Sequence, residues 1–296
     1  MQASNTIAIA TMIRNETPYL KEWVEYHRLL GVSKFWLFDN NSSDHPEWLL
    51  NEEIASGLIE ILPLPSRHPC HVFPTSDQRD AYHIANGKAF GVFDWIAFID
   101  VDEFIVPMRD RGLPECLARY TDAGAIFVNW RCFGTNQVER IPAGEPILPY
   151  LTACSLKAHP SNCVGKTICR PTHFAYTVGN WSPHHVSIKS ESPYYNGSGQ
   201  IMRNCFGEQF ENPGVHEDRF IRINHYVQRD EYYFRTRRLE NPRITDNTPQ
   251  ARADYFAVLM EQHESYNAIS DFKILDLIRK QFPQAWKNLW REGATP

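Results

Sequence analysis

Residues 95–104 of the chain read Trp-Ile-Ala-Phe-Ile-Asp-Val-Asp-Glu-Phe, an apolar run of strand length that ends in three acids. A strand buried on both faces is apolar throughout, and ligands of an open α/β sheet bind beyond the carboxyl ends of its strands. On an extended backbone Asp100 and Asp102 would point the same way. Two carboxylates so near to each other repel, and a cation between them removes this repulsion. The stretch therefore predicts a site for Mn²⁺ or Mg²⁺ that holds a nucleoside diphosphate.

Strand and helix signals alternate on either side of this stretch. The pattern predicts strands at residues 6–12, 34–38, 58–62 and 95–99. A helix is expected from Thr17, as its cap, with Pro18 at its first position, and a second helix over residues 76–91. Strands that alternate with helices predict an α/β fold with a mostly parallel sheet and right-handed crossovers.

The pattern changes after Phe104, where Pro, Gly and aromatic residues become frequent. Residues 190–215 are rich in Gly, Ser, Asn and Pro, and we expect a long mobile loop there. We expect one catalytic domain over residues 1–240, with a C-terminal helical extension over residues 241–296 packed on it. Further strands are predicted at 125–130, 167–170, 174–178 and 220–227, and further helices at 229–239, 251–263 and 271–290.

Composition narrows the classes of function. The chain has 296 residues, is 43% hydrophobic and has a net charge of −5, so nothing attracts it as a whole to nucleic acid. Its seven cysteines contain no Cys-x-x-Cys pair, which favours reduced thiols over a cysteine zinc site. The absence of an apolar run of about 18 residues and of a leader pattern predicts a cytoplasmic protein. Basic residues that flank an apolar stripe in residues 275–289 would also allow peripheral contact with the inner face of a membrane.

Polar side chains follow the first two predicted strands as well. The carboxyl ends of parallel strands lie at one edge of a sheet, so we expect these side chains to share a rim with Asp100 and Asp102 and to bind the base or ribose of a nucleotide. The residues of this rim are Arg14, Asn15, Glu16, Asp39, Asn41 and Asp44.

Other residues are candidates for the remaining roles. A metal held by one or two carboxylates has room for an imidazole, and either His185 or His225 would supply it. Lys166 opens a short strand and is the best basic residue to hold phosphate. The general base of a transfer to a hydroxyl should be Asp or Glu, and Glu217 and Asp218 are the first candidates, ahead of Glu208, Glu211 and Asp230.

With these residues in place, the chain resembles glycosyltransferases of the GT-A fold. It is most similar to glycosyltransferase family 92 and to bacterial relatives described as family 2-like. The resemblance runs over most of residues 6–240, and its most specific part is the Asp-Val-Asp-Glu-Phe block. The matching segments are Arg14-Asn-Glu, Tyr19-Leu-Lys-Glu-Trp23, His27, Leu30-Gly-Val, Phe38-Asp-Asn-Asn-Ser-Ser-Asp44, residues 95–104, Trp130-Arg-Cys-Phe-Gly134, Lys166-Thr-Ile-Cys-Arg-Pro171 and Asn224-His-Tyr226.

The resemblance implies transfer of a hexose from a nucleotide sugar, often a UDP-sugar, to a glycan or another hydroxyl acceptor, with inversion at the anomeric carbon. It implies that the Asp-x-Asp motif, Asp100 and Asp102, holds Mn²⁺ and that a later histidine completes the metal shell. Eukaryotic members are usually anchored in a membrane. The chain shows no anchor, so the resemblance favours a bacterial enzyme of polysaccharide biosynthesis.

Two alternatives remain open at this point. One is a catalytically inactive module that binds a nucleotide sugar or a glycan. The other is a sugar nucleotidyltransferase, which needs a glycine-rich phosphate loop after the first strand. Residues 11–16 read Thr-Met-Ile-Arg-Asn-Glu and contain no glycine, which disfavours it.

Overall fold

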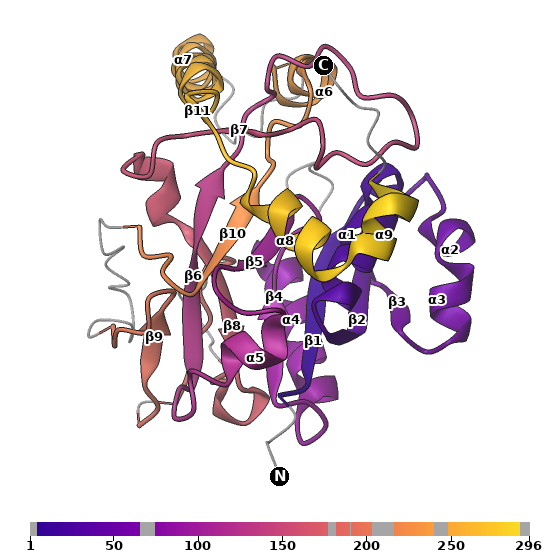
Figure 1. Ribbon diagram of the computed structural model, residues 1–296, viewed down its shortest axis with the longest axis vertical. Helices are drawn as coiled ribbons and strands as arrows, with labels where there is room; N and C mark the ends of the chain where they lie inside the picture. The colour runs from indigo at the N-terminus through magenta and orange to yellow at the C-terminus, as the bar shows by residue number, and fades with distance from the viewer. Residues whose placement is uncertain are drawn as a thin grey trace.

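One large mixed sheet organises the protein (Figure 1). Its strands run in the order β3-β2-β1-β4-β8-β6-β10-β5, and β9 pairs with β6 beside that path. The computed structural model describes residues 5–65, 75–176, 182–189, 191–202, 216–239 and 248–290. The strands of this sheet are β1 (Ile7–Ile13), β2 (Val32–Asp39), β3 (Ile59–Pro63), β4 (Trp95–Phe98), β5 (Glu103–Pro107), β6 (Ala125–Cys132), β8 (Gly165–Cys169), β9 (Tyr194–Asn196) and β10 (Ile221–His225).

Helices flank the sheet, and a small second sheet joins β7 (Ala153–Cys154) to β11 (Ile269–Ser270). Short 3-10 segments cover Pro160–Cys163 and Pro171–His173, and a π-helix, Phe234–Leu239, continues α6. The α-helices are α1 (Thr17–Leu29), α2 (Pro46–Leu49), α3 (Asn51–Ala55), α4 (Thr75–Ala89), α5 (Leu113–Leu117), α6 (Glu231–Tyr233), α7 (Pro249–Ser265), α8 (Lys273–Gln281) and α9 (Pro283–Leu289).

The direction of the strands divides the sheet into two parts. The first part, β3-β2-β1-β4, is parallel throughout. In the second part β8 runs antiparallel to β4 and β6, and β5 runs antiparallel to β10, whereas β6 is parallel to β9 and β10. The predicted α/β fold, a mostly parallel sheet flanked by helices, is therefore confirmed.

Strand β1 shows how the sequence builds a core on both faces of the sheet. Ile7 and Ile9 point into the larger cluster, which also contains Trp23 of α1. The alternate residues Ala8 and Ala10 point into a second cluster beneath α4. Successive side chains of a strand face opposite sides, and small alanines on one side let α4 lie close to the sheet.

The C-terminal helices share this core. Ile274 and Ile278 of α8 and Trp286 of α9 belong to the cluster that contains Trp23. In Figure 1, α8 and α9 lie in front of α1. The apolar stripe over which membrane contact was considered is therefore mostly buried against the protein. No helix among the described residues is long and apolar enough to cross a membrane.

Three local predictions need correction. Thr17 is the first residue of α1 and not its cap, because Glu16 holds the cap position and the Thr17 N–H donates to the Asp44 carboxylate at 2.9 Å. The helix predicted over residues 271–290 is interrupted at Phe282, since Pro283 lacks the N–H that a continuous helix needs. Within the predicted loop 190–215, Tyr194–Asn196 form β9 on the edge of β6, and residues 203–215 lie outside the described residues.

Two other predictions differ from the structure in part. In the strand predicted at 174–178, Phe174 forms an isolated bridge with Ile188, and residues 177–178 lie outside the described part of the chain. Strand β5 was missed altogether. Its residues 103–107 begin with the last of the three acids, and no turn residue such as Gly or Pro separates this strand from β4.

Candidate active site

Asp100 and Asp102 lie in the turn between β4 and β5, and Glu103 is the first residue of β5. The Asp100 N–H donates to the Glu103 carboxylate at 2.9 Å, and the Glu103 N–H donates to the Asp100 carbonyl at 3.1 Å. The expectation that Asp100 and Asp102 lie on an extended backbone is therefore wrong. The physical reason is the Glu103 side chain, which closes the turn on Asp100 while Glu103 itself begins β5.

Asp102, Glu103 and His225 form the group in which a metal ion would fit. One potential ligand atom of each lies within 4.8 Å of the others, and His225 Nε2 lies 3.7 Å from Asp102 Oδ2. The sheet brings them together, because His225 of β10 pairs with Glu103 of β5 in the antiparallel ladder. Tyr226 adds a backbone bond, N–H to the Asp102 carbonyl, at 2.8 Å.

The chemistry of this group suits a divalent cation. Glu103 Oε1 and His225 Nδ1 are buried and have no hydrogen-bond partner among the described residues. Buried polar atoms are nearly always paired, so the unpaired Glu103 Oε1, in one group with Asp102, is a position at which a ligand would fit. Carboxylate oxygen and imidazole nitrogen are ligands that Mn²⁺ accepts, and carboxylate oxygens suit Mg²⁺.

Lys166 of β8 is placed among the acids. Its Nζ donates to Asp100 Oδ2 at 2.8 Å and lies 3.9 Å from Glu103 Oε1. The lysine is fully buried while the Asp100 side chain is 41% exposed. Burial alone would lower the pKa of Lys166, but the neighbouring carboxylates of Asp100 and Glu103 raise it well above its ordinary value. Lys166 is therefore a charged partner of the acids.

The same cluster changes the affinity of Glu103 for protons. Burial, together with the charges of Asp100 and Asp102, raises the pKa of Glu103 well above its ordinary value, although the Lys166 ammonium opposes this. A cation bound by Glu103 would compete with that proton, since metal ligands bind in their deprotonated form.

The rim residues at the ends of β1 and β2 lie side by side, as the parallel register predicts, with Ile13 opposite Asp39. Their polar atoms are largely used to join the two loops. Asn15 accepts from the Ser43 N–H at 2.8 Å, and Asp39 accepts from the Ser42 N–H at 3.0 Å. Asn41 is exposed and has a left-handed backbone, with φ of 57°. Arg14 is half-buried at the same rim.

A residue that the sequence analysis missed connects this rim to the acids. Arg229 is 2% exposed and donates through Nη2 to Glu16 Oε2 at 2.7 Å. Its guanidinium stacks on the Tyr19 ring, 3.4 Å from the centroid, and its charge interacts with that of Asp102. The segment around Arg229 read as a surface helix, so no signal pointed to a buried cation.

The structure separates the two histidines between which the sequence could not choose. His225 belongs to the metal group, whereas His185 does not. The backbone of His185 forms an isolated β-bridge with Ser182. The adjacent His184 lies near the acids instead. Its ring meets Trp130 edge to face, with centroids 5.2 Å apart, and the Trp130 ring lies 4.2 Å from that of His225. Burial, with the nearby Lys166 charge, lowers the pKa of His184 to about 4.

Neither predicted general base belongs to the metal group. Asp218 lies 2.7 Å from Lys157 Nζ and 2.9 Å from His216 Nε2. Burial would raise the pKa of Asp218, but these two partners hold it well below its ordinary value. Glu217 is half-buried. Asp230 caps α6 through a bond from the Tyr233 N–H, while Glu208 and Glu211 fall outside the described ranges.

Comparison with known proteins agrees with the resemblance. A glycosyltransferase family 92 protein of Ricinus communis is 28% identical over 202 residues, covering 66% of this chain and 34% of the relative. One of Oryza sativa subsp. japonica is 28% identical over 231 residues, covering 76% and 37%. The chain thus spans about a third of the length of the curated relatives it matches.

Solved structures show a more distant likeness. TarS 1–349 of S. aureus in complex with UDP-GlcNAc is 10% identical with a TM-score of 0.41, covering 97% of this chain and 76% of that one. Glucosyl-3-phosphoglycerate synthase of Mycobacterium tuberculosis, in complex with Mn²⁺, UDP and glucosyl-3-phosphoglycerate, is 18% identical with a TM-score of 0.29, covering 44% of this chain and 46% of that one. In contrast, the model of glycosyltransferase family 92 matches residues 4–228, three quarters of the sequence, and the chain belongs to that family.

Proposed function

We propose that this chain is a metal-dependent glycosyltransferase that moves a hexose from a UDP-sugar to a hydroxyl group of a glycan, with inversion. The observation that carries the proposal is the group of Asp102, Glu103 and His225, with Lys166 beside it. Family membership supports the reaction class, and the unpaired Glu103 Oε1 supports binding of the cation that a diphosphate needs.

The residues of the site would divide the work between them. Asp102, Glu103 and His225 would hold Mn²⁺ or Mg²⁺, which when bound stabilises a leaving diphosphate. Lys166 keeps the excess negative charge of Asp100 and Glu103 balanced before the donor binds. Glu16, held by Arg229, and the rim of Asn15 and Asp39 would bind the nucleoside.

The transition state sets the remaining requirements. As the bond to the diphosphate loosens, the anomeric carbon gains oxocarbenium character. A carboxylate on the opposite face then has to take the proton of the acceptor hydroxyl. We assign this role to Glu217, whose carboxylate takes part in no ion pair among the described residues, in preference to the doubly paired Asp218.

The test is release of nucleoside diphosphate from a panel of UDP-, GDP- and TDP-sugars, with Mn²⁺ and with EDTA. Wild type is compared with Asp102→Ala and with Asp276→Ala, a control in which an exposed acid of α8 is lost. We expect release from a UDP-hexose that EDTA and Asp102→Ala abolish and Asp276→Ala leaves intact. Metal-dependent binding of a donor without release, with every acceptor tried, would contradict the enzyme and favour the inactive binding module.

A further inference from the structure

Two polar atoms next to the metal group have no partner in the part of the chain that the structure describes. They are Trp130 Nε1 and His184 Nδ1, and both are buried. Buried donors and acceptors are nearly always satisfied in native proteins, and leaving one unsatisfied is unfavourable. Two such atoms, on neighbouring rings beside the metal group, therefore point to a ligand contact at this place.

The rings come from separate elements and meet at the site. Trp130 lies on β6, opposite Ile223 of β10, and its ring is 4.2 Å from His225. His184 lies in the segment 182–189. Its backbone carbonyl accepts a hydrogen bond from the Thr167 hydroxyl of β8 at 3.4 Å. The two rings meet at 81°, so the edge of one faces the plane of the other.

The two atoms differ in hydrogen-bonding character. An indole nitrogen can only donate. A neutral imidazole has one donor and one acceptor nitrogen, so His184 Nδ1 is the acceptor of the pair in the tautomer that is protonated at Nε2. One donor and one acceptor together match a single hydroxyl group, which both accepts and donates.

The position of Trp130 and His184 indicates which part of the donor carries this hydroxyl group. In a nucleotide sugar the anomeric carbon is bonded to a phosphate oxygen, so the transferred sugar lies directly beside the metal-bound diphosphate. Trp130 is in ring contact with His225 of the metal group. We infer that Trp130 and His184 form a subsite that binds one hydroxyl group of the transferred hexose. The inference rests on the proposed function, because the metal group must hold the diphosphate of the donor.

The experiment measures the affinities of UDP and of UDP-galactose or UDP-glucose by calorimetry in the presence of Mn²⁺. The variants are Trp130→Phe, which keeps an aromatic ring and removes the N–H, and His184→Ala. The control is His173→Ala, since His173 Nδ1 also lacks a partner among the described residues. His173 follows the carboxyl end of β8, whereas Lys166 lies near the start of that strand. A set of UDP-monodeoxyhexoses, tested on wild type and His184→Ala, then identifies the hydroxyl.

We expect each site variant to bind the UDP-hexose about tenfold more weakly, the equivalent of about 1.4 kcal/mol, and to bind UDP as wild type does. Wild type should bind the deoxy analogue that lacks the recognised hydroxyl about tenfold more weakly than the full UDP-hexose. His184→Ala should bind this analogue and the full UDP-hexose with the same affinity. Equal weakening of UDP and UDP-hexose would overturn the subsite and leave the proposed function standing. Failure of wild type to bind either ligand would overturn both.

Discussion

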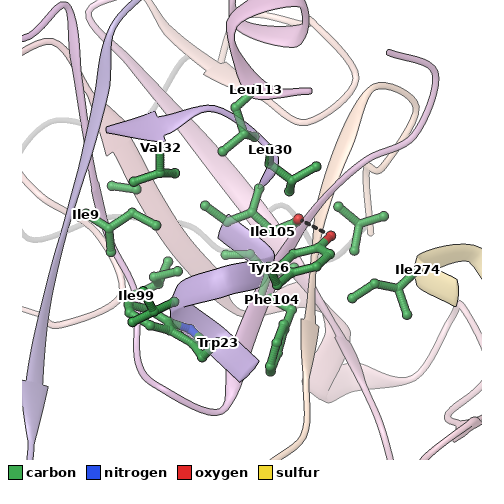
Figure 2. Packing of buried hydrophobic residues seen from close by; sticks show 14 of the residues in the cluster. Ile9, Trp23, Tyr26, Leu30, Val32, Ile99, Phe104, Ile105, Leu113 and Ile274 are labelled. Carbon is green, nitrogen blue, oxygen red and sulfur yellow. Dashed lines mark hydrogen bonds between the residues drawn. The ribbon is translucent and has the colours of Figure 1, made fainter. Parts of the chain in front are cut away.

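The imidazole of His27 accepts a hydrogen bond from the backbone N–H of Ile105, with 3.2 Å between Nε2 and the amide nitrogen. Two further side chains of α1 hold the same strand, Trp23 Nε1 to the Glu103 carbonyl and Tyr26 Oη to the Ile105 carbonyl, each at 2.8 Å. Figure 2 shows the Tyr26 contact within the core. Because β5 is the last strand in the sheet order, α1 supplies the bonds that a neighbouring strand would make, and it thereby positions Glu103.

His27 should make the stability of the protein fall in acid. Burial lowers the pKa of His27 from 6.5 to about 3, and its Nδ1 lies 2.8 Å from the Trp23 carbonyl. The unfolded chain therefore takes up a proton below about pH 6.5 that the folded chain refuses, and this group contributes stability that is lost as the pH falls. The change approaches about 1.4 kcal/mol per pH unit at most.

The measurement is urea unfolding of wild type and His27→Gln at about pH 7.5 and about pH 5. The glutamine keeps an acceptor for the Ile105 N–H but does not titrate. We expect the advantage of wild type over the variant to shrink as the pH falls. A difference that is the same at both pH values would mean that His27 is not held neutral.

Loss of the buried lysine should strongly destabilise the fold. Lys166→Met leaves Glu103, and in part Asp100, without the cation that balances them. Removal of one partner from a fully buried ion pair lowers the free energy of unfolding by about 3–5 kcal/mol, and the 41% exposure of the Asp100 side chain brings the expected loss below that range. The matched control is Lys157→Met, because the Lys157 side chain is 59% exposed and its pair with Asp218 should contribute less than about 1 kcal/mol. Similar unfolding midpoints for the two variants would contradict a charged, buried Lys166.

Glu22 should oppose His27 in its dependence on pH. Its carboxylate accepts from the Ile147 N–H at 2.7 Å, the Leu148 N–H at 3.2 Å and the Trp290 indole at 2.8 Å. Burial nevertheless raises the pKa of Glu22 from 4.5 to about 7. The folded chain thus binds a proton that the unfolded chain has released, and this stabilisation is present below about pH 4.5 and is lost as the pH rises to about 7.

Urea unfolding of wild type and Glu22→Gln across that range provides the check. We expect the stability of wild type relative to the variant to decrease by up to about 3 kcal/mol as the pH rises. The Trp290 contact offers a second signal, since indole fluorescence should report any loosening of the end of α9. An advantage of wild type that stays constant would show that Glu22 has an ordinary pKa, and one that grows with pH would show a lowered pKa, so either result would contradict the prediction.

The sequence predicted those parts of the protein in which local pattern and function coincide. The apolar run at 95–99 and the acids after it located β4 and the site, and the strand-end rule placed Asn15 and Asp39 on one rim. It could not show that Glu103 turns inward, because an acid in a row of acids resembles a solvated strand end. The pairing of Glu103 with His225 depends on the register of two distant strands, which no local pattern encodes. The contact of His184 with Trp130 depends on how the segment 182–189 folds, which the sequence pattern does not encode.

The two candidate bases can be separated by their charge environments. Asp218 is held ionised by Lys157 and His216, so it has little tendency to accept a proton. We expect Asp218→Asn to lower stability and leave kcat nearly unchanged in the folded fraction. Glu217→Gln should lower kcat by about 100-fold or more, since a general base typically contributes that much. Steady-state kinetics with the donor and acceptor found active would decide, and loss of kcat in Asp218→Asn alone would move the role to that residue.

The geometry of the metal group makes a prediction that distinguishes the two histidines of the sequence analysis. His225 shares the group with Asp102 and Glu103, so His225→Ala removes one of the three proposed ligands. We expect it to weaken Mn²⁺ binding by at least about tenfold, in the range seen for changes at metal sites. His185→Ala should leave the affinity unchanged, because His185 lies outside that group. Mn²⁺ binding to the protein without donor, followed by calorimetry or by the electron paramagnetic resonance of free Mn²⁺, measures both variants on one scale. If His185→Ala bound Mn²⁺ more weakly and His225→Ala bound it as wild type does, the prediction would be wrong. His185 would then replace His225 in the set of ligands.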